Sequence, residues 1–574
     1  MIATLKISTG QYSDKGRKSS NQDFHGIRVP KDSLLEIKGI AVAMADGISS
    51  SYVSQIASET AVKTFLEDYY CTSEAWSVKG SVDRVLNSIN SWLHSQTMRG
   101  PHRYDKNKGY VCTFSTLVIK NHSAHIFHLG DTRVYRLNDN GLEQLTNDHR
   151  LWESEEHSYL SRALGIDPTC NYDHQSMRVK VGDIFILSTD GVYEFVNTKK
   201  IIKTIADNNQ DLDAAAKIIV SLAYEAGSDD NLSIQIVRID ELPEQTSNKV
   251  KQQAEQLPLP PLLEARQEFD GYIILRKIHG SSRSHVYLAQ DIETKKNVVL
   301  KAPSVDLGND AEHLERLLME EWIARRINSA HVLKADLPNR QRTFLYTVFE
   351  YIEGQTLAQW ATDNPKPKLE SVRVIVEQIA KGLHAFHRME MLHQDIRPEN
   401  ILIDIEGTVK IIDFGSVSVA GIQESATKDP LTYLLGTALY SAPEYFLGEQ
   451  GTIRSELFSL GVITYFLLSG KYPYGTKVAK TKTRSAQRKL WYDSVLDDDS
   501  EIPAWVDDAI HRAVSPLPER RYEELFEFIH DIRQPNKVFL NKTRPPLLER
   551  NPVAVWQGLS FILAVIIVYL LNIG

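Results

Sequence analysis

Short apolar runs that end in an acidic residue recur along the first half of the chain. Two of them are IAVAMADG at 40–47 and DIFILSTDG at 183–191, and a third alternating run follows Asp230. Such runs of apolar and alternating positions predict buried or half-buried β-strands. Apolar residues spaced three and four apart predict helices over 53–69 and 81–98. These elements predict a domain that contains both strands and helices.

The second half of the chain has a different order of elements. The stretch 269–291 predicts two strands around a turn, and NVVLKAP at 297–303 predicts a further strand. Residues 311–327 carry the apolar stripe of a helix, and 456–474 predicts a long buried helix. The chain as a whole is therefore predicted to be α+β.

An uncharged apolar run lies near the C-terminus. Val553 to Ile573 covers 21 residues, and a helix of this length measures roughly 31 Å, enough to cross a bilayer. Trp556 and Tyr569 stand near its ends, and several basic residues precede it, so the bulk of the chain is expected on the cytoplasmic side of an inner membrane. A buried helix packed on the preceding domain is the alternative.

A polar stretch rich in Gln and Pro separates the two halves. It predicts an exposed, semi-stiff linker, with a structured helix over 245–256 as the alternative. The predicted divisions are a first catalytic domain, this linker, a second catalytic domain, a juxtamembrane segment and a transmembrane helix, at 1–240, 241–268, 269–540, 541–552 and 553–573 respectively.

Composition narrows the class of protein. A chain of 574 residues is too long for one core. Its net charge of −9 argues against a general nucleic-acid binder, and no nucleic-acid partner is expected. The three cysteines form no CxxC pair, which favours a reducing compartment.

Acidic residues at predicted strand ends are the candidate chemistry of the first half. A lone Asp-Gly is usually a turn, but several exposed and rigidly held carboxylates that converge would form an oxygen-rich cage. Such a cage suits Mg²⁺ or Mn²⁺. Two such ions can share a water and clamp a phosphoryl group. The acidic residues in question are Asp23, Asp46, Asp131, Asp190 and Asp230.

The order and spacing of these motifs resemble the metal-dependent Ser/Thr protein phosphatases of the type 2C family. The resemblance covers roughly residues 5–240 and includes NQD, ADG, LGDTRVYRL, LTNDH, ILSTDG and SDDNLS. It implies an α-β-β-α sandwich in which Asp23, Asp46, Asp190 and Asp230 hold two ions. It also implies that Gly47 binds through its carbonyl and that Asp131 helps with a third, weaker ion. The family's phosphate-gripping Arg is replaced by Lys18, with Arg17 beside it, and the sequence leaves open which of them grips phosphate.

The stretch LHQDIRPENILIDIEGTVKIIDFG at 392–415 carries the candidate chemistry of the second half. Phosphoryl transfer from ATP requires a carboxylate to accept the substrate hydroxyl's proton and ligands that hold magnesium on the phosphates. Asp395 suits the first role, and Asn400 and Asp413 suit the second. This stretch resembles the catalytic loop and Asp-Phe-Gly motif of protein kinases, which implies a bilobal fold.

The kinase resemblance extends over about 270 residues and implies further ATP-site residues. Lys301 would pair the α- and β-phosphates, with Glu320 or else Glu321 as its partner, and Arg397 would hold the γ-phosphate. Adenine would meet backbone groups from Glu350 to Ile352, and the phosphate loop would include Gly280. No glycine falls in the places that the family's G-x-G-x-x-G pattern expects, because the register reads His-Gly-Ser-Ser-Arg-Ser from position 279.

The sequence therefore predicts a bifunctional protein-Ser/Thr phosphatase and kinase, with phosphoprotein substrates, ATP and a membrane as partners. The alternative is an active phosphatase regulated by a nucleotide-binding pseudokinase module, which the missing glycines motivate. A third possibility is an active kinase joined to a phosphatase-like domain.

Overall fold

The structure of the protein is a computed structural model that divides into two compact units. The first unit is Met1–Leu257 with the short segments Arg388–Met391 and Ser418–Lys428, and the second is the remainder. The structure describes residues 4–101, 103–138, 141–152, 158–243, 257–281, 284–304, 311–336, 340–424, 438–496, 502–542, 556–557, 559–560, 562–563 and 566.

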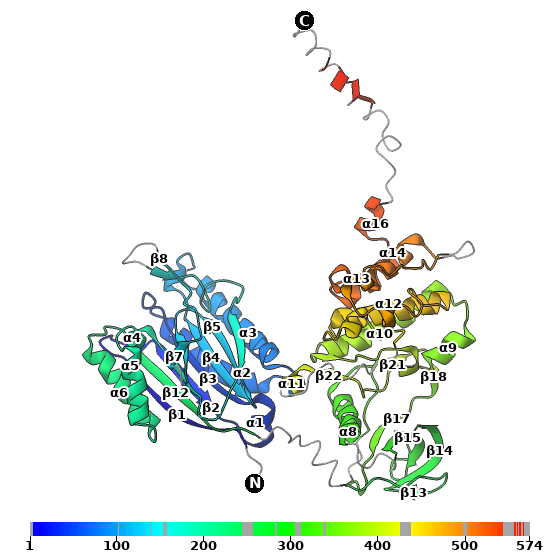
Figure 1. Cartoon of the computed structure of the whole chain (residues 1–574), viewed down its shortest axis with the longest axis horizontal. Helices are drawn as coiled ribbons and strands as arrows, with labels where there is room; N and C mark the ends of the chain where they lie inside the picture. The colour runs from blue at the N-terminus through cyan, green and yellow to red at the C-terminus, as the bar shows by residue number, and fades with distance from the viewer. Residues whose placement is uncertain are drawn as a thin grey trace. The chain divides into compact units, whose positions relative to one another are not determined.

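Two antiparallel sheets form the centre of the first unit (Figure 1). One has the strand order β1-β12-β11-β6-β7 and the other β10-β5-β4-β3-β2. The strands of the first sheet are β1 (Lys6–Asp14), β12 (Leu232–Glu241), β11 (Ile184–Ser188), β6 (Arg133–Asn138) and β7 (Gly141–Gln144). Those of the second are β10 (Asp173–Arg178), β5 (Ser123–Leu129), β4 (Phe114–Lys120), β3 (Ile40–Asp46) and β2 (Asp23–Arg28). A separate small hairpin joins β8 (Arg150–Trp152) to β9 (Ser158–Leu160).

Helices cover the outer face of each sheet. The second sheet is covered by α2 (Ser54–Cys71) and α3 (Val78–Arg99), and the first by α5 (Thr198–Asp207) and α6 (Leu212–Glu225). Short elements complete the unit: α1 (Asp32–Lys38), η1 (Lys106–Lys108) and α4 (Asp190–Tyr193). The predicted α-β-β-α order is confirmed, and helix 81–98 begins earlier than predicted because Ser77 caps it by accepting a hydrogen bond from the Gly80 N–H.

The core between the two sheets explains why the apolar runs are continuous. Val42 and Met44 of β3 pack with Phe185 and Leu187 of β11 in one buried cluster. On β3 the alternate residues, such as Ala43, face the α2–α3 layer in a second cluster. A strand buried on both faces needs apolar residues at every position, and its first polar residue marks the point where the strand leaves the core.

The second unit has a small sheet lobe and a larger helical lobe. The sheet has the order β13-β14-β15-β16-β17, and α8 (Ala311–Arg326) packs against β17. Its strands are β13 (Glu268–Phe269), β14 (Tyr272–Gly280), β15 (Ser284–Asp291), β16 (Asn297–Pro303) and β17 (Thr347–Glu350). These bounds confirm the strands that the sequence predicts over 269–291 and 297–303.

Helices dominate the larger lobe. Its α-helices are α9 (Leu357–Asp363), α10 (Leu369–His387), α12 (Ile453–Ser469), α13 (Arg484–Gln487), α14 (Ala504–Ala513), α15 (Leu525–Arg533) and α16 (Lys537–Lys542). Its 3₁₀ turns are η3 (Pro398–Asn400), η5 (Pro443–Leu447), η6 (Val478–Lys480) and η7 (Pro518–Arg520). The second unit also contains β18 (Gly354–Thr356), β20 (Ile401–Asp404) and β21 (Val409–Ile411). Nearby in sequence, β22 (Ser418–Val419) and α11 (Ala420–Gln423) belong to the segment assigned to the first unit, and β19 (Met391–Leu392) lies at the division.

The buried helix predicted over 456–474 lies further toward the N-terminus, as α12. Thr452 and Ser455 form a capping box that starts it. Gly470, with φ 66° in the left-handed region, ends it. The apolar residues after Gly470 therefore belong to the following loop and not to the helix.

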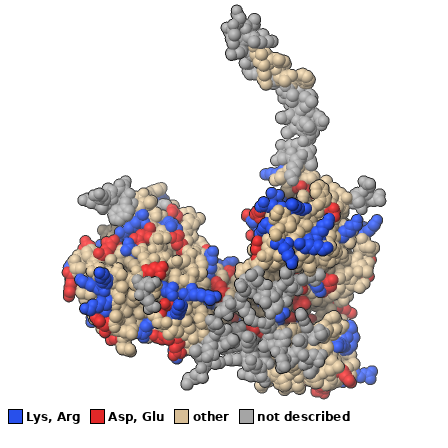
Figure 2. All heavy atoms as spheres, viewed as in Figure 1, with Lys and Arg blue, Asp and Glu red and all other residues tan. Residues whose placement is uncertain are grey.

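The predicted juxtamembrane segment 541–552 and transmembrane helix 553–573 lie largely outside the described residues, as do residues 244–256 of the predicted linker. Among the residues that the structure describes, no helix has the length and apolar character needed to cross a membrane. Figure 2 shows acidic and basic side chains on the visible face of each unit, consistent with the modest net charge of −9.

Candidate active sites

Two acidic residues of the first unit stand directly opposite each other at the ends of neighbouring strands. Asp23 is the first residue of β2, and Asp46 is the last residue of β3. The two are cross-strand partners. Burial raises the pKa of Asp23 to about 7, and burial followed by the charge of Asp23 raises the pKa of Asp46. Gly47 continues from Asp46 and forms an isolated bridge with Cys112.

The other acidic residues come from the ends of β5, β11 and β12. Asp190 begins α4 directly after β11, and burial raises its pKa to about 6. Asp230 precedes β12, and Asp131 lies in the turn between β5 and β6. The negative charges of Asp23, Asp190, Asp131 and Asp230 all raise the pKa of Asp46, after the larger effect of burial. Sequence-distant carboxylates are therefore gathered in one region of the first unit.

Hydrogen bonds satisfy only part of this acidic group. Thr189 Oγ1 donates to Asp23 Oδ2 at 3.0 Å, whereas the buried Asp23 Oδ1 has no hydrogen-bond partner. A buried, unpaired carboxylate oxygen fits a hard divalent cation such as Mg²⁺ or Mn²⁺. Among the described residues, no three acidic, His or Cys side chains are close enough to bind one ion together.

Lys18 and Arg17 have different surroundings. Lys18 Nζ lies 3.4 Å from Asp230 Oδ2, beside the acidic group. Arg17 donates to the backbone carbonyl oxygens of Ser228 and Tyr224, and its guanidinium carbon lies 4.7 Å from the centre of the Tyr224 ring. Of the two predicted phosphate-gripping side chains, Lys18 is the one placed next to the acidic residues.

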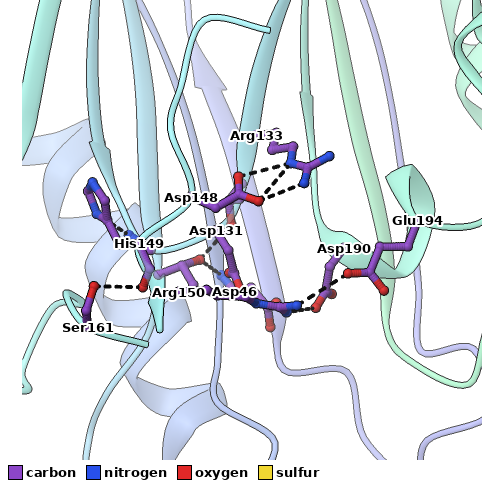
Figure 3. Close-up of polar contacts among 12 residues, drawn as sticks. Asp46, Asp131, Arg133, Asp148, His149, Arg150, Ser161, Asp190 and Glu194 are labelled. Atoms are coloured by element: carbon purple, nitrogen blue, oxygen red, sulfur yellow. Dashed lines mark hydrogen bonds and ion pairs between the residues drawn. The ribbon is translucent and has the colours of Figure 1, made fainter. Parts of the chain in front are cut away.

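Arg150 is a residue of this site that the sequence reasoning missed. Its guanidinium bridges Asp131 and Asp190, and Figure 3 shows it running between them beside Asp46. The available signal was its position, because Arg150 directly follows the motif LTNDH that the sequence analysis singled out.

In the second unit, an ion pair joins β16 to α8. Lys301 Nζ donates to Glu320 Oε1 and Oε2 at 2.8 and 2.7 Å, and it lies 3.2 Å from Asp413 Oδ1. Burial alone would lower the pKa of Lys301, but the Glu320 and Asp413 carboxylates outweigh it and raise that pKa above its usual value. Glu321, the other sequence candidate, pairs instead with Arg342 at 2.5 Å.

The catalytic-loop residues lie close together. Asn400 Nδ2 donates to the backbone oxygen of Asp395 at 2.9 Å and to its Oδ2 at 3.1 Å. Arg397 precedes η3 and lies 3.5 Å from Glu399. Asp413 has φ 65°, which is uncommon for a residue other than glycine and typical of functional positions.

Glu456 of α12 accepts hydrogen bonds from the backbone of this loop. Its Oε1 accepts the backbone N–H groups of His393 and Gln394, the latter at 3.0 Å, and its Oε2 lies 2.5 Å from His387 Nε2. Gln394 has φ 64°. The Glu456 carboxylate thus holds the backbone of the catalytic loop in place.

The predicted adenine and phosphate-loop residues lie in the small lobe or directly after its last strand. Gly280 ends β14, and Ser281 closes the turn with an Oγ donation to Ser284 O at 3.3 Å. Glu350 ends β17, where Lys410 Nζ lies 2.8 Å from its Oε1, and Ile352 follows and is partly buried. Gly280 and Glu350 therefore lie at the ends of two strands of one sheet, β14 and β17, which β15 and β16 separate.

Comparison with known proteins identifies both units. The sequence model of the protein kinase domain matches residues 272–535, and that of protein phosphatase 2C matches residues 11–223. The chain therefore carries a protein phosphatase 2C domain followed by a protein kinase domain, two domains of enzymes.

Individual curated proteins and solved structures are similar to parts of this chain. The serine/threonine-protein kinase PrkC of Bacillus subtilis is 32% identical over 270 residues, covering 46% of this chain and 40% of that protein. The kinase PknA of Corynebacterium glutamicum is 34% identical over 204 residues, covering 34% of this chain and 42% of that protein. The chain thus spans about two fifths of the length of these curated relatives. The solved catalytic domain of the phosphatase PstP with two manganese ions is 20% identical, with 41% of this chain and all of that chain covered and a TM-score of 0.35.

Proposed function

We propose that the chain is a bifunctional enzyme, a protein-serine/threonine phosphatase and an ATP-dependent protein-serine/threonine kinase. The observation that carries the kinase half is the pairing of Lys301 with Glu320, within reach of Asp413. This pairing is the arrangement that ATP phosphates require of a kinase. The buried acidic group of the first unit supports the phosphatase half.

In the phosphatase domain, Mg²⁺ or Mn²⁺ would be held by side chains at the strand ends and by the carbonyl of Gly47. When bound, such ions supply an activated water for attack on a phosphate ester. Lys18, beside this group, would attract the substrate phosphate as a point charge. The side chains that would hold the ions are Asp23, Asp46, Asp190 and Asp230.

In the kinase domain, Lys301 would position the α- and β-phosphates of ATP, and Arg397 the γ-phosphate. Asp395 would accept the proton of the substrate hydroxyl. Asn400 already orients the Asp395 carboxylate through its amide, and together with Asp413 it would hold Mg²⁺ on the phosphates.

The test uses the full chain carrying Asp190→Ala, so that the phosphatase does not erase its own signal. Incorporation of labelled phosphate from ATP into a generic acceptor protein is compared with and without Asp395→Asn. Loss of incorporation with the second change supports the kinase half, and equal incorporation in both proteins rejects it.

The alternative is a kinase domain that binds nucleotide and regulates the phosphatase without transferring phosphate. The observation that favours it is the phosphate-loop turn, where Ser281 and not a glycine follows Gly280, so that side chains crowd the approach of phosphate to the backbone. In that case ATP changes the rate of phosphopeptide hydrolysis while no labelled phosphate is transferred.

We also propose that residues 553–573 anchor the chain in an inner membrane with both domains cytoplasmic. Support comes from the 21 uncharged residues of this run and from the basic residues before it. Full-length chain should remain in the membrane fraction after alkaline carbonate extraction, and a chain ending at residue 552 should not. Equal extraction of both would reject the anchor.

A further inference from the structure

The Arg150 side chain lies among carboxylates from separate parts of the phosphatase domain (Figure 3). Its Nε donates to Asp131 Oδ2 at 2.5 Å, and its Nη2 donates to Asp190 Oδ2 at 2.6 Å. Its Nη1 lies 3.3 Å from Glu194 Oε1. Each nitrogen of the guanidinium therefore faces a different carboxylate. The side chain is only 21% exposed, so water weakens these charge-assisted contacts little.

The backbone before Arg150 is fastened to the segment that carries Asp131. The His149 N–H donates to the Gly130 oxygen at 2.7 Å, and the Gly130 N–H donates to His149 Nδ1 at 3.1 Å. The Ser161 N–H donates to the His149 oxygen at 2.8 Å. Because Gly130 immediately precedes Asp131 and His149 immediately precedes Arg150, the hydrogen bonds between Gly130 and His149 hold Arg150 close to Asp131, in addition to the attraction of their charges.

The acidic residue nearest to Arg150 in sequence has a different partner. Arg133 donates to Asp148 through Nε at 3.0 and 3.2 Å and through Nη2 at 2.7 Å, and its guanidinium lies 3.9 Å from the centre of the Tyr193 ring. Arg133 thus neutralises Asp148, while Arg150 is directed to the predicted metal-binding carboxylates.

The charges of the site fit two divalent cations together with Arg150. Five carboxylates face one another, since the charges of four of them raise the pKa of the fifth, Asp46, after the effect of burial. Two divalent cations and one guanidinium carry five positive charges, which balance these five carboxylates and leave aside only Glu194, whose side chain is 49% exposed. A third divalent ion would leave an excess of positive charge around Arg150. Lys18, partnered with Asp230 near the surface, would then remain to attract phosphate.

We propose that the guanidinium of Arg150 takes the place of a third divalent cation between Asp131 and Asp190, so that the phosphatase site binds two ions and admits no third while Arg150 is in place. The proposal rests on the phosphatase function proposed above. A guanidinium stays protonated at any ordinary pH, so this internal cation is permanent. Asp131 then serves as the partner of Arg150 rather than as a metal ligand.

The test is a Mn²⁺ titration of the full chain without nucleotide, followed by calorimetry and by the electron paramagnetic resonance of free Mn²⁺. Wild type should bind two ions in the phosphatase domain. Arg150→Ala should bind a third Mn²⁺ ion, with a dissociation constant at least tenfold lower than that of any third ion bound by wild type. Adding Asp131→Asn to Arg150→Ala should remove that gain. The control is Arg162→Ala, which removes an arginine paired with Asp173 outside the acidic group and should not change the count.

Each outcome has a distinct meaning. Equal ion counts and affinities for wild type and Arg150→Ala overturn the role of Arg150 but leave the phosphatase assignment standing. Wild type that binds no Mn²⁺ in the phosphatase domain rejects the phosphatase assignment itself. If Arg150→Ala does not fold, Arg150→Gln decides, because it keeps a hydrogen-bond donor and loses the charge, so it should gain the ion. Any Mn²⁺ bound by the kinase domain is common to all variants and cancels in the comparison.

Discussion

Replacing Arg521 by alanine should strongly destabilise the kinase domain. Arg521 and Glu444 form a buried pair, with side chains 0% and 3% exposed. Arg521 Nη1 and Nη2 donate to the two Glu444 oxygens at 2.7 and 2.8 Å. The guanidinium also donates to the backbone oxygens of Ser515 and Arg454 at 2.7 and 2.8 Å.

The magnitude follows from what the substitution leaves behind. In Arg521→Ala the Glu444 carboxylate loses its charged partner, keeps the Ser455 hydroxyl at 2.7 Å and its own backbone N–H, and stays buried. Breaking a buried pair in this way costs about 3–5 kcal/mol. For a domain of this size each kcal/mol corresponds to roughly 2–4 °C, so the melting temperature should fall by roughly 6–20 °C.

Differential scanning calorimetry of the full chain measures this fall. The unfolding transition of the kinase domain is the one whose midpoint temperature rises when a non-hydrolysable ATP analogue and Mg²⁺ are added, because a ligand that binds the folded state stabilises it. The transition of the phosphatase domain should not move in the variant.

Arg484→Ala is the matched control. Arg484 lies 2.5 Å from Glu449, but the two side chains are 40% and 44% exposed, and an exposed pair contributes only about 0–1 kcal/mol. If Arg521→Ala lowers the kinase transition no more than Arg484→Ala does, the assignment of a buried pair to Arg521 and Glu444 is wrong.

Three further predictions concern the two sites and their pH dependence. Lys301→Met should lower the rate of phosphoryl transfer from ATP about 10²–10³-fold, because it removes one preorganised hydrogen-bond donor. The rate of phosphopeptide hydrolysis should not change. Transfer from labelled ATP and a phosphopeptide assay measure the two rates. Chelation by EDTA should abolish hydrolysis and added Mn²⁺ should restore it, and hydrolysis that survives dialysis against EDTA would contradict a metal-dependent site. Burial would raise the pKa of Glu444, but the hydrogen bonds from Arg521 outweigh burial and lower this pKa. The ionised Glu444 therefore stabilises the folded domain fully above about pH 4.5, and this stabilisation is lost as the pH falls through the lowered pKa. Calorimetry from pH 7 down to pH 3 should therefore show a steeper loss of stability below about pH 4.5 for wild type than for Glu444→Gln; parallel curves would refute the shift.

Much of the fold could be predicted because local pattern and burial agree. The run 40–47 is apolar at consecutive positions because β3 is buried on both faces, and its acidic end lies where the strand leaves the core. The partner of Lys301 could be narrowed to two adjacent residues by counting back from VLK at 332–334 within the kinase resemblance. The choice between Glu320 and Glu321 needed the structure, since adjacent residues on α8 face different sides and Glu321 is held by Arg342.

The site was harder to predict where pairing depends on distant segments. Asp131 and Asp190 could be proposed as ligands from their strand-end positions, but nothing in their local sequence indicates that Arg150 lies between them. The orientation of Arg17 toward Tyr224 likewise depends on α6, which lies about 200 residues further along the chain. Local patterns identify the residue types of a site, and tertiary packing decides which charges meet.

The most direct test of the central claim, two independent phosphate-handling sites in one chain, is a double dissociation with Asp190→Ala and Asp395→Asn. Phosphopeptide hydrolysis with Mn²⁺ and phosphate transfer from labelled ATP are measured on wild type, each single variant and the double variant. The account predicts that Asp190→Ala loses hydrolysis and keeps transfer, that Asp395→Asn loses transfer and keeps hydrolysis, and that the double variant loses both. Transfer that persists at full rate in the double variant, or hydrolysis that persists in Asp190→Ala, would contradict it.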